Sequence, residues 1–361
     1  MNRAEWVLLG ATLMVPLAAV LHFLPEMPAW AVFAAGGVAI GVLAEWMRRA
    51  TEQIALRAGP SAGGLLNVSF GSAAELILAL SVIAGGHVDV VRAQITGSII
   101  GTSLLGLGLA CLAGGWTAKQ QTFSRDRAGL LASLLTIVVV ALLLPAVFHL
   151  DELHRALPPT VRKLSERSLS VGVAVVLLTV YAGNLIFTLV THRDVFADDE
   201  ARGKPRWSLL RSISTLVVAT AAVAGCAELV SGALQATAAT LHLPLLFVGV
   251  VPLALIGTAA DLFAAVSFAR KGQMELVVSI CIGSSIQVGL VVAPLLVLIS
   301  LAMGQPMSLV FPSVLDLFAI ASAVVITKSI AADGETNWFE GLMLVGVYAL
   351  LALAFFFVAP G

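Results

Sequence analysis

Residues 71–80 read GSAAELILAL, and residues 257–266 read GTAADLFAAV. Each stretch places a glycine, a hydroxyl residue, two alanines and then an acid inside a long apolar run. The second acid, Asp261, has no charged neighbour in the sequence between Glu228 and Arg270. An isolated carboxylate in apolar surroundings is unfavourable unless it is paired or binds a cation. The two stretches therefore indicate a functional site to which the chain contributes the same motif twice.

The composition is that of an integral membrane protein. Of the 361 residues, 59% are hydrophobic and only 11% are charged, and the mean hydropathy is +1.02. Soluble domains carry about 25% charged residues. The net charge of −1 offers no basic surface, so no nucleic-acid partner is expected. The three cysteines lie in apolar segments at no disulfide or metal spacing, which favours packing roles.

Apolar runs of about 20 residues predict membrane helices. We expect an all-α polytopic membrane protein with eleven transmembrane helices, over residues 6–24, 28–50, 61–86, 88–114, 128–150, 169–191, 209–232, 244–269, 273–302, 310–330 and 338–358. The first run is interpreted as a helix rather than a signal peptide, because Glu5 weakens the positive start that a signal peptide needs.

Basic residues in the loops predict the orientation. With the N-terminus in the cytoplasm, 15 of the 20 Lys and Arg residues fall on the cytoplasmic side, as the positive-inside rule requires. The sequence therefore predicts a protein of the bacterial inner (plasma) membrane, with its N-terminus in the cytoplasm and its C-terminus outside. The partners that it predicts are inorganic cations and the lipid bilayer, and it leaves the oligomeric state open.

The long polar stretch THRDVFADDEARGKPRW, residues 191–207, divides the chain into two parts. We expect an extra N-terminal helix over 1–27, a first repeat over 28–192, a cytoplasmic loop over 193–208 and a second repeat over 209–361. Each repeat crosses the membrane five times, so the second runs opposite to the first, as in inverted-repeat transporters.

Three features recur in the same order in both repeats. The first is the pair of acid motifs, with Gly71, Ser72 and Glu75 matched by Gly257, Thr258 and Asp261. In the next helix Gly97-Ser98 matches Gly283-Ser284, and in the preceding helix Ala44-Glu45 matches Ala227-Glu228. A glycine four residues before each acid shares its helix face. In an inverted pair, both acids are expected near the bilayer centre, facing each other.

Two facing carboxylates in a membrane call for a counter-charge. An ionised acid at the bilayer centre is unfavourable by about 2.5–3.5 kcal/mol even on the insertion scale, and two of them repel. Calcium takes 6–8 oxygen ligands from carboxylates, carbonyls and waters, whereas one nearby thiol, that of Cys281, argues against zinc or copper. When the cation leaves, protons neutralise the acids. Competition between cation and protons for one site predicts an antiporter, with no catalytic residues and no bound cofactor.

These motifs resemble those of the calcium/cation antiporter superfamily, specifically its cation/proton (calcium/proton) exchanger branch, which carries Gly-Asn-x-x-Glu in each half. Residues 52–80 (EQIALRAGPSAGGLLNVSFGSAAELILAL) are similar to the first repeat of that family, and residues 227–295 are similar to the second. The resemblance implies sodium/calcium-exchanger-type repeats and secondary active exchange of calcium, or a related divalent cation, for protons by alternating access. It implies ion contacts at Glu75 and Asp261, supporting contacts at Ser72, Thr258, Ser98, Ser284 and Gln287, and acids along the access paths at Glu45 and Glu228.

Departures from the family pattern keep alternatives open. Ser72 and Thr258 replace the two asparagines, and Asp261 replaces the second glutamate. A sodium-coupled calcium exchanger or a sodium/proton exchanger of the same superfamily therefore stays possible. An intramembrane aspartyl protease is disfavoured because one acid is Glu75 and Asp261 lacks a Gly-x-Gly-Asp setting.

Several of the predicted functional roles have a purely structural role as their alternative. Glu45 has an ion pair with Arg48 and Arg49 as its alternative. Ser98 and Ser284 have hydrogen bonds to their own helices as theirs. Pro244, Pro252 and Pro294 indicate breaks in two of the spans near the site, and their alternative is that proline is tolerated in membrane helices for packing reasons.

Overall fold

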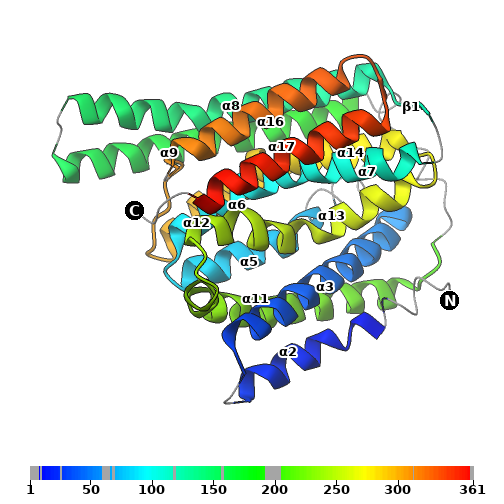
Figure 1. The fold of residues 1–361 in the computed structure, drawn as a ribbon, viewed down its shortest axis with the longest axis horizontal. Helices are drawn as coiled ribbons and strands as arrows, with labels where there is room; N and C mark the ends of the chain where they lie inside the picture. Colours follow the sequence, from blue (N-terminus) through cyan, green and yellow to red (C-terminus); the bar gives the residue numbers. More distant parts are fainter. Residues whose placement is uncertain are drawn as a thin grey trace. The chain divides into compact units, whose positions relative to one another are not determined.

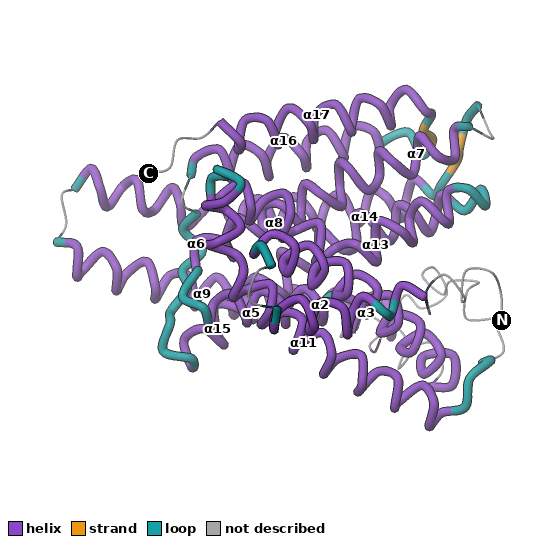
Figure 2. Tube along the Cα trace, turned by 60° about the horizontal axis from the view of Figure 1, so that its bottom comes forward, coloured by secondary structure: helices purple, strands orange, loops and turns teal. Residues whose placement is uncertain are grey.

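The computed structural model describes residues 8, 10–24, 27–58, 66, 70–116, 119–155, 158–191, 205–311 and 313–357. This part of the chain is almost entirely helical (Figures 1 and 2). Within it, nine helical segments are long and apolar enough to cross a membrane. The shorter apolar helices α2 (Met14–Phe23) and α5 (Ala73–Ala84) lie in the two remaining predicted spans. The prediction of an all-α polytopic membrane protein is confirmed.

The chain forms two compact units, and each draws on both halves of the sequence. Unit 1 comprises Met1–Gly85 and Thr179–His242, and unit 2 comprises Gly86–Leu178 and Leu243–Gly361. These units do not follow the division at residues 193–208, because helices of both predicted repeats pack together within each unit. The helix α9 (Pro159–Ile186), which continues into the π-helical turn η2 (Phe187–Thr191), contains the boundary between the two units.

Unit 1 is organised around two long helices, α3 (Ala29–Ala58) and α11 (Leu209–Thr240), which pack along each other (Figure 1). Gly36 permits this close approach, because a Cβ there would lie 2.8 Å from Val230 Cγ2. The helix α2 packs against both long helices, and α5 packs against α11. Ser231 Oγ of α11 donates a hydrogen bond to the Ser81 carbonyl of α5 at 3.0 Å, which joins α5 to the long pair.

Three spans of unit 2 each contain a π-helical turn. The first runs through α6 (Val88–Ile100), η1 (Gly101–Gly106) and α7 (Leu107–Gly115). The second runs through α12 (Leu245–Val248), η4 (Gly249–Leu253) and α13 (Ala254–Ala269). The third runs through α14 (Met274–Gln287), η5 (Val288–Val292) and α15 (Ala293–Ala302). Such turns are rare overall, but many of those that occur lie at functional sites.

The remaining helices of unit 2 are α8 (Arg125–His154), most of α9, α16 (Val314–Ala331) and α17 (Trp338–Phe357). α16 contacts α8, α17 and α6 (Figure 1). Ser313 begins α16 with a capping box, in which its hydroxyl accepts from the first turn and Asp316 accepts from the Ser313 backbone N–H. This arrangement satisfies two of the donors that a helix N-terminus leaves free.

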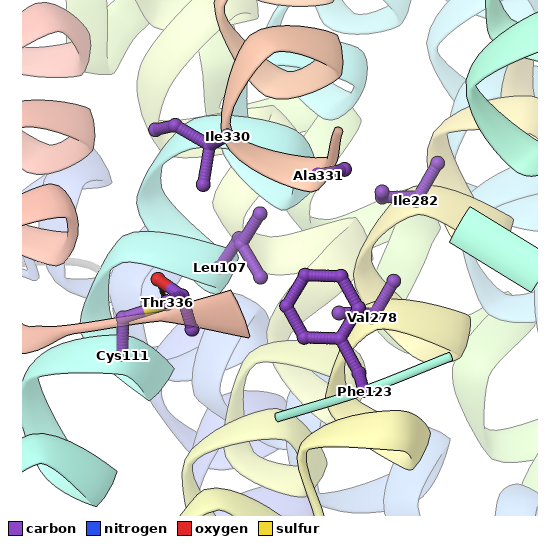
Figure 3. A pocket seen from close by; sticks show the side chains of 8 residues that line it. All are labelled: Leu107, Cys111, Phe123, Val278, Ile282, Ile330, Ala331 and Thr336. Atoms are coloured by element: carbon purple, nitrogen blue, oxygen red, sulfur yellow. Dashed lines mark hydrogen bonds between the residues drawn. The ribbon is translucent and has the colours of Figure 1, made fainter. Parts of the chain in front are cut away.

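A short antiparallel ribbon joins the ends of several helices of unit 2. β1 (Gln121–Thr122) pairs with β2 (Glu335–Thr336), with Gln121 opposite Thr336. The Gln121 amide donates to the Cys111 carbonyl at 3.1 Å, and the Thr336 hydroxyl donates to Cys111 Sγ at 3.4 Å. Beneath the ribbon lies an apolar hollow with no room for a water molecule (Figure 3), lined by Leu107, Cys111, Phe123, Val278, Ile282, Ile330, Ala331 and Thr336. It is therefore part of the packed core rather than a binding pocket.

Several helices extend beyond the apolar runs that predict them. α3 continues to Ala58 and α9 begins at Pro159. The additional turns carry ion pairs four residues apart, Arg48 with Glu52 and Arg162 with Glu166, each at 3.6 Å, which stabilise helices outside the hydrocarbon layer.

The prolines do not break their spans. Pro252 lies within the π turn η4 and Pro294 lies in the first turn of α15, directly after the π turn η5. The wider turn accommodates the missing N–H of proline, so the chain stays helical through both positions.

Candidate functional site

In unit 1, Glu75 lies in the first turn of α5 and is 3% exposed. Ser72 precedes the helix as its N-cap residue with a non-helical backbone, and Gly71 beside it is exposed. The positive end of the helix dipole favours a negative charge at this position. The first acid motif therefore places its carboxylate at the beginning of a helix, in a buried position.

The other two predicted acids of unit 1 lie in different environments. Glu45 on α3 accepts from Arg48 Nε and Arg49 Nε, each at 2.7 Å. It makes the ion pair that was the alternative to an access-path role. Glu228 on α11 is exposed. The access-path role of both residues stays a prediction.

In unit 2, Asp261 lies inside α13 and is half-buried. Ser284 Oγ on α14 donates a hydrogen bond to Asp261 Oδ2 at 2.6 Å. A hydrogen bond to an ionised carboxylate is about twice as strong as one between neutral groups. Ser284 therefore contacts the acid rather than its own helix, and the second motif and the helix after it are joined through their polar side chains.

The neighbours of Asp261 on α13 leave oxygen lone pairs available. Thr258 is buried, and its hydroxyl donates to the Ala254 carbonyl at 2.9 Å. Because this bond uses only the hydroxyl proton, the oxygen retains acceptor capacity. Gly257, four residues before the acid, is half-buried and places no side chain on that helix face.

A second polar contact lies one residue further along α14. The hydroxyls of Ser285 and Thr102 are 2.7 Å apart, which joins α14 to the π turn η1. Thr102 also donates to the Ser98 carbonyl at 2.8 Å, and Ser285 contacts the Ile99 carbonyl at 3.2 Å. Gln287 is half-buried and is the last residue of α14 before η5.

Two residues of this polar region are not predicted from the sequence. Ser285 follows Ser284 directly and is overlooked because only one serine of the pair has a counterpart in the first repeat. Gln94 is fully buried on α6, one turn before Ser98. Its carboxamide inside an apolar run is the signal that identifies it, since uncharged amides are also unfavourable in such surroundings.

The fold and the polar residues define a class of protein. The chain is a polytopic helical membrane protein whose two matching motifs each carry a carboxylate in a membrane helix, and residues of this kind mark ion pathways. The family description "Sodium/calcium exchanger protein" matches residues 28–190 and 211–357, which is most of the chain. The chain therefore belongs to this family, on the cation/proton exchanger branch of the calcium/cation antiporters. It is a secondary transporter rather than an enzyme.

Relatives resemble the chain over nearly its whole length. A "Ca(2+)/H(+) antiporter" of Synechocystis is 40% identical over 99% of both chains. "Ca(2+)/H(+) antiporter ChaA" of Bacillus subtilis is 36% identical, again over 99% of both.

Solved structures show the same fold. The structure of native YfkE superimposes with a TM-score of 0.83 at 31% identity, covering 99% of this chain and 100% of the other. The structure of the H+/Ca2+ exchanger CAX shares the fold at 15% identity, with a TM-score of 0.69 over 99% and 93% of the two chains.

Proposed function

We propose that the chain exchanges calcium, or a related divalent cation, for protons across the membrane by alternating access. The observation that carries this proposal is the carboxylate of Asp261, half-buried in an apolar helix and bonded at 2.6 Å to Ser284. A carboxylate in this setting is suited to binding a cation or a proton in turn. The relatives named as Ca(2+)/H(+) antiporters support the choice of ions.

In this proposal one carboxylate from each repeat, Glu75 and Asp261, binds either the cation or protons. Oxygen atoms of the neighbouring residues complete the calcium ligands, since calcium prefers several hard oxygen donors. The residues to which we assign these supporting contacts are Ser72, Thr258, Ser98, Ser284 and Gln287, with backbone carbonyls beside Gly71 and Gly257. Each cation that binds displaces the protons that the acids held, which couples the two fluxes.

The proposal includes an orientation, with the N-terminus in the cytoplasm and the C-terminus outside. It rests on the bias of Lys and Arg toward one set of loops. In this orientation the ribbon of β1 and β2, together with the basic C-terminal end of α3, lies on the cytoplasmic side. Cysteine labelling of the exposed Arg57 and Met303 positions from each side of intact cells tests it.

A vesicle experiment tests the exchange itself. The purified chain is reconstituted into liposomes, and calcium uptake is measured against an imposed proton gradient without sodium, and then against a sodium gradient at equal pH. We expect uptake driven by the proton gradient alone, with an apparent calcium affinity that falls as the pH drops on the binding side, because protons and calcium compete. Uptake that requires the sodium gradient would replace proton coupling by sodium coupling.

A further inference from the structure

Gln94 is the least explained polar side chain in unit 2. It is 1% exposed, and neither its carbonyl oxygen nor its amide nitrogen has a hydrogen-bond partner within the described part of the chain. Ser98, one turn further along α6, is fully buried, and its hydroxyl also lacks a partner there. More than about 90% of buried polar groups are hydrogen-bonded. Each unsatisfied group destabilises a fold by about 1–3 kcal/mol, so three in one place require an explanation.

Open space lies within one turn of these polar groups. Gln94, Ser98 and Gly101 are four and then three residues apart, so they lie on the same side of the helix. Gly101 is buried, yet a Cβ built on it would meet no atom within 4 Å. One turn before Gly101 the helix is tightly packed, since a Cβ on Gly97 would lie 1.9 Å from the Val250 carbonyl oxygen. The room that the structure leaves is therefore beside Gly101, one turn after Ser98.

The same face continues the polar contacts of Asp261. From Asp261 the hydrogen bond leads to Ser284, the next residue Ser285 contacts Thr102, and Thr102 donates to the Ser98 carbonyl. Gln94 lies eight residues before Thr102, or about 12 Å along the helix axis. Polar groups thus follow this side of α6 for two turns beyond the contact with α14.

The chemistry of this face suits a cation that is still partly hydrated. A carboxamide oxygen and a hydroxyl oxygen are hard neutral ligands of the kind that calcium accepts together with water. Neutral ligands hold an ion less firmly than carboxylates, which favours passage over retention. We propose that Gln94, one turn before the ligand Ser98, forms a neutral transit subsite, at which the exchanged cation is held with some of its water on its way to or from Asp261. This inference rests on the proposed calcium exchange.

The test uses two substitutions with opposite expected effects. Gln94→Leu keeps a similar volume and removes both polar atoms, and we expect the half-saturating calcium concentration for vesicle uptake to rise roughly tenfold. Gln94→Glu adds a charge at the same position, and we expect the half-saturating concentration to fall while maximal turnover drops. A purely packing role predicts no such opposition.

Thermal unfolding separates binding from folding. Without calcium, the Gln94→Leu protein should unfold at the wild-type temperature or higher, because unpaired buried groups have been removed. The rise in unfolding temperature on adding calcium should be smaller than in the wild type. Gln94→Met serves as a second apolar variant if Gln94→Leu does not fold.

Gln121→Leu is the matched control, because Gln121 is also buried but its amide donates to Cys111 in the ribbon. We expect that variant to lose stability and to keep the wild-type calcium dependence. Wild-type calcium dependence in both Gln94 variants would overturn the subsite and leave ordered water as the occupant of this space. If the wild type shows no proton-driven calcium uptake, the proposed function fails, and the calcium-dependent unfolding temperatures still decide whether Gln94 contributes to binding.

Discussion

The spans 88–115 and 274–302 have the same local design and different surroundings. Both carry a Gly-Ser pair, at Gly97-Ser98 and Gly283-Ser284, and both change to a π-helical turn within four residues of that serine. Ser284 bonds to Asp261, whereas Ser98 has no side-chain partner in the described part of the chain. A Cβ on Gly97 would strike the Val250 carbonyl, whereas one on Gly283 would meet nothing within 4 Å.

The difference teaches that the internal repeat preserves backbone geometry more faithfully than side-chain contacts. Both spans belong to unit 2, but the first lies against α12, α13, α16 and α17, whereas the second lies against α8 and α13. A motif that occurs in two different environments makes different packing contacts in each. Equivalent sequence positions therefore have different roles, and paired substitutions can separate them.

The largest expected effect on calcium exchange comes from removing the charge of Asp261, the acid that Ser284 of the span 274–302 contacts. Asp261→Asn keeps the shape and the bond from Ser284 but removes the charge, so calcium-driven exchange should fall to the background of empty liposomes. Glu75→Gln should do the same if each repeat contributes one carboxylate. Near-normal uptake by either variant, at wild-type protein levels in the vesicles, would contradict the assignment of these two carboxylates.

The two glycines offer the sharpest contrast in stability. Gly97→Ala places a methyl group against the Val250 backbone, and overpacking of this kind lowers the free energy of unfolding by about 1–3 kcal/mol or more. Gly283→Ala has room and should unfold within a degree or two of the wild type. Thermal unfolding of both variants in detergent measures the comparison. Equal unfolding temperatures would show that α6 and η4 are not pressed together at Gly97.

The two serines should differ by less. Ser284→Ala removes a hydrogen bond to a charged group, which contributes about 1.5–3 kcal/mol, so the half-saturating calcium concentration should rise roughly tenfold or more. Ser98→Ala removes a hydroxyl without a partner in the described chain, so any change reports on its role toward the cation alone. Calcium titrations of uptake rank the variants, and a larger effect at Ser98 than at Ser284 would reverse the comparison.

The sequence predicts the fold well because the bilayer imposes a simple rule. Apolar runs of the right length identify every long helix that the structure describes, and the repeated Gly-x-x-x-acid motif singles out Asp261, whose bond to Ser284 the structure shows. The ends of α3 and α9 are missed because amphipathic, ion-paired turns continue a helix past the hydrocarbon layer. Hydropathy does not report such turns.

Other features leave no periodic signal. A π turn differs from an α turn by one residue, and neither the glycines of η1 nor the valines of η5 distinguish the two. The strands of the ribbon have two residues each, too few for any alternation to appear. The contact of Ser285 with Thr102 depends on which helices meet in unit 2, which a motif match cannot reveal.

Because Gln121 pairs with Thr336, the ribbon forms only late in synthesis of the protein. At about 5–20 residues per second, β1 leaves the ribosome roughly ten to forty seconds before its partner strand exists. During that interval the Gln121 amide and the Cys111 carbonyl lie at the end of α7, and the helix α17 that packs against α7 has not yet been synthesised. The helix α17 begins just after β2 and therefore emerges later still. A nascent chain released before residue 336 therefore lacks the strand pairing that joins these helix ends of unit 2, and quality-control proteases meet the ends unpaired.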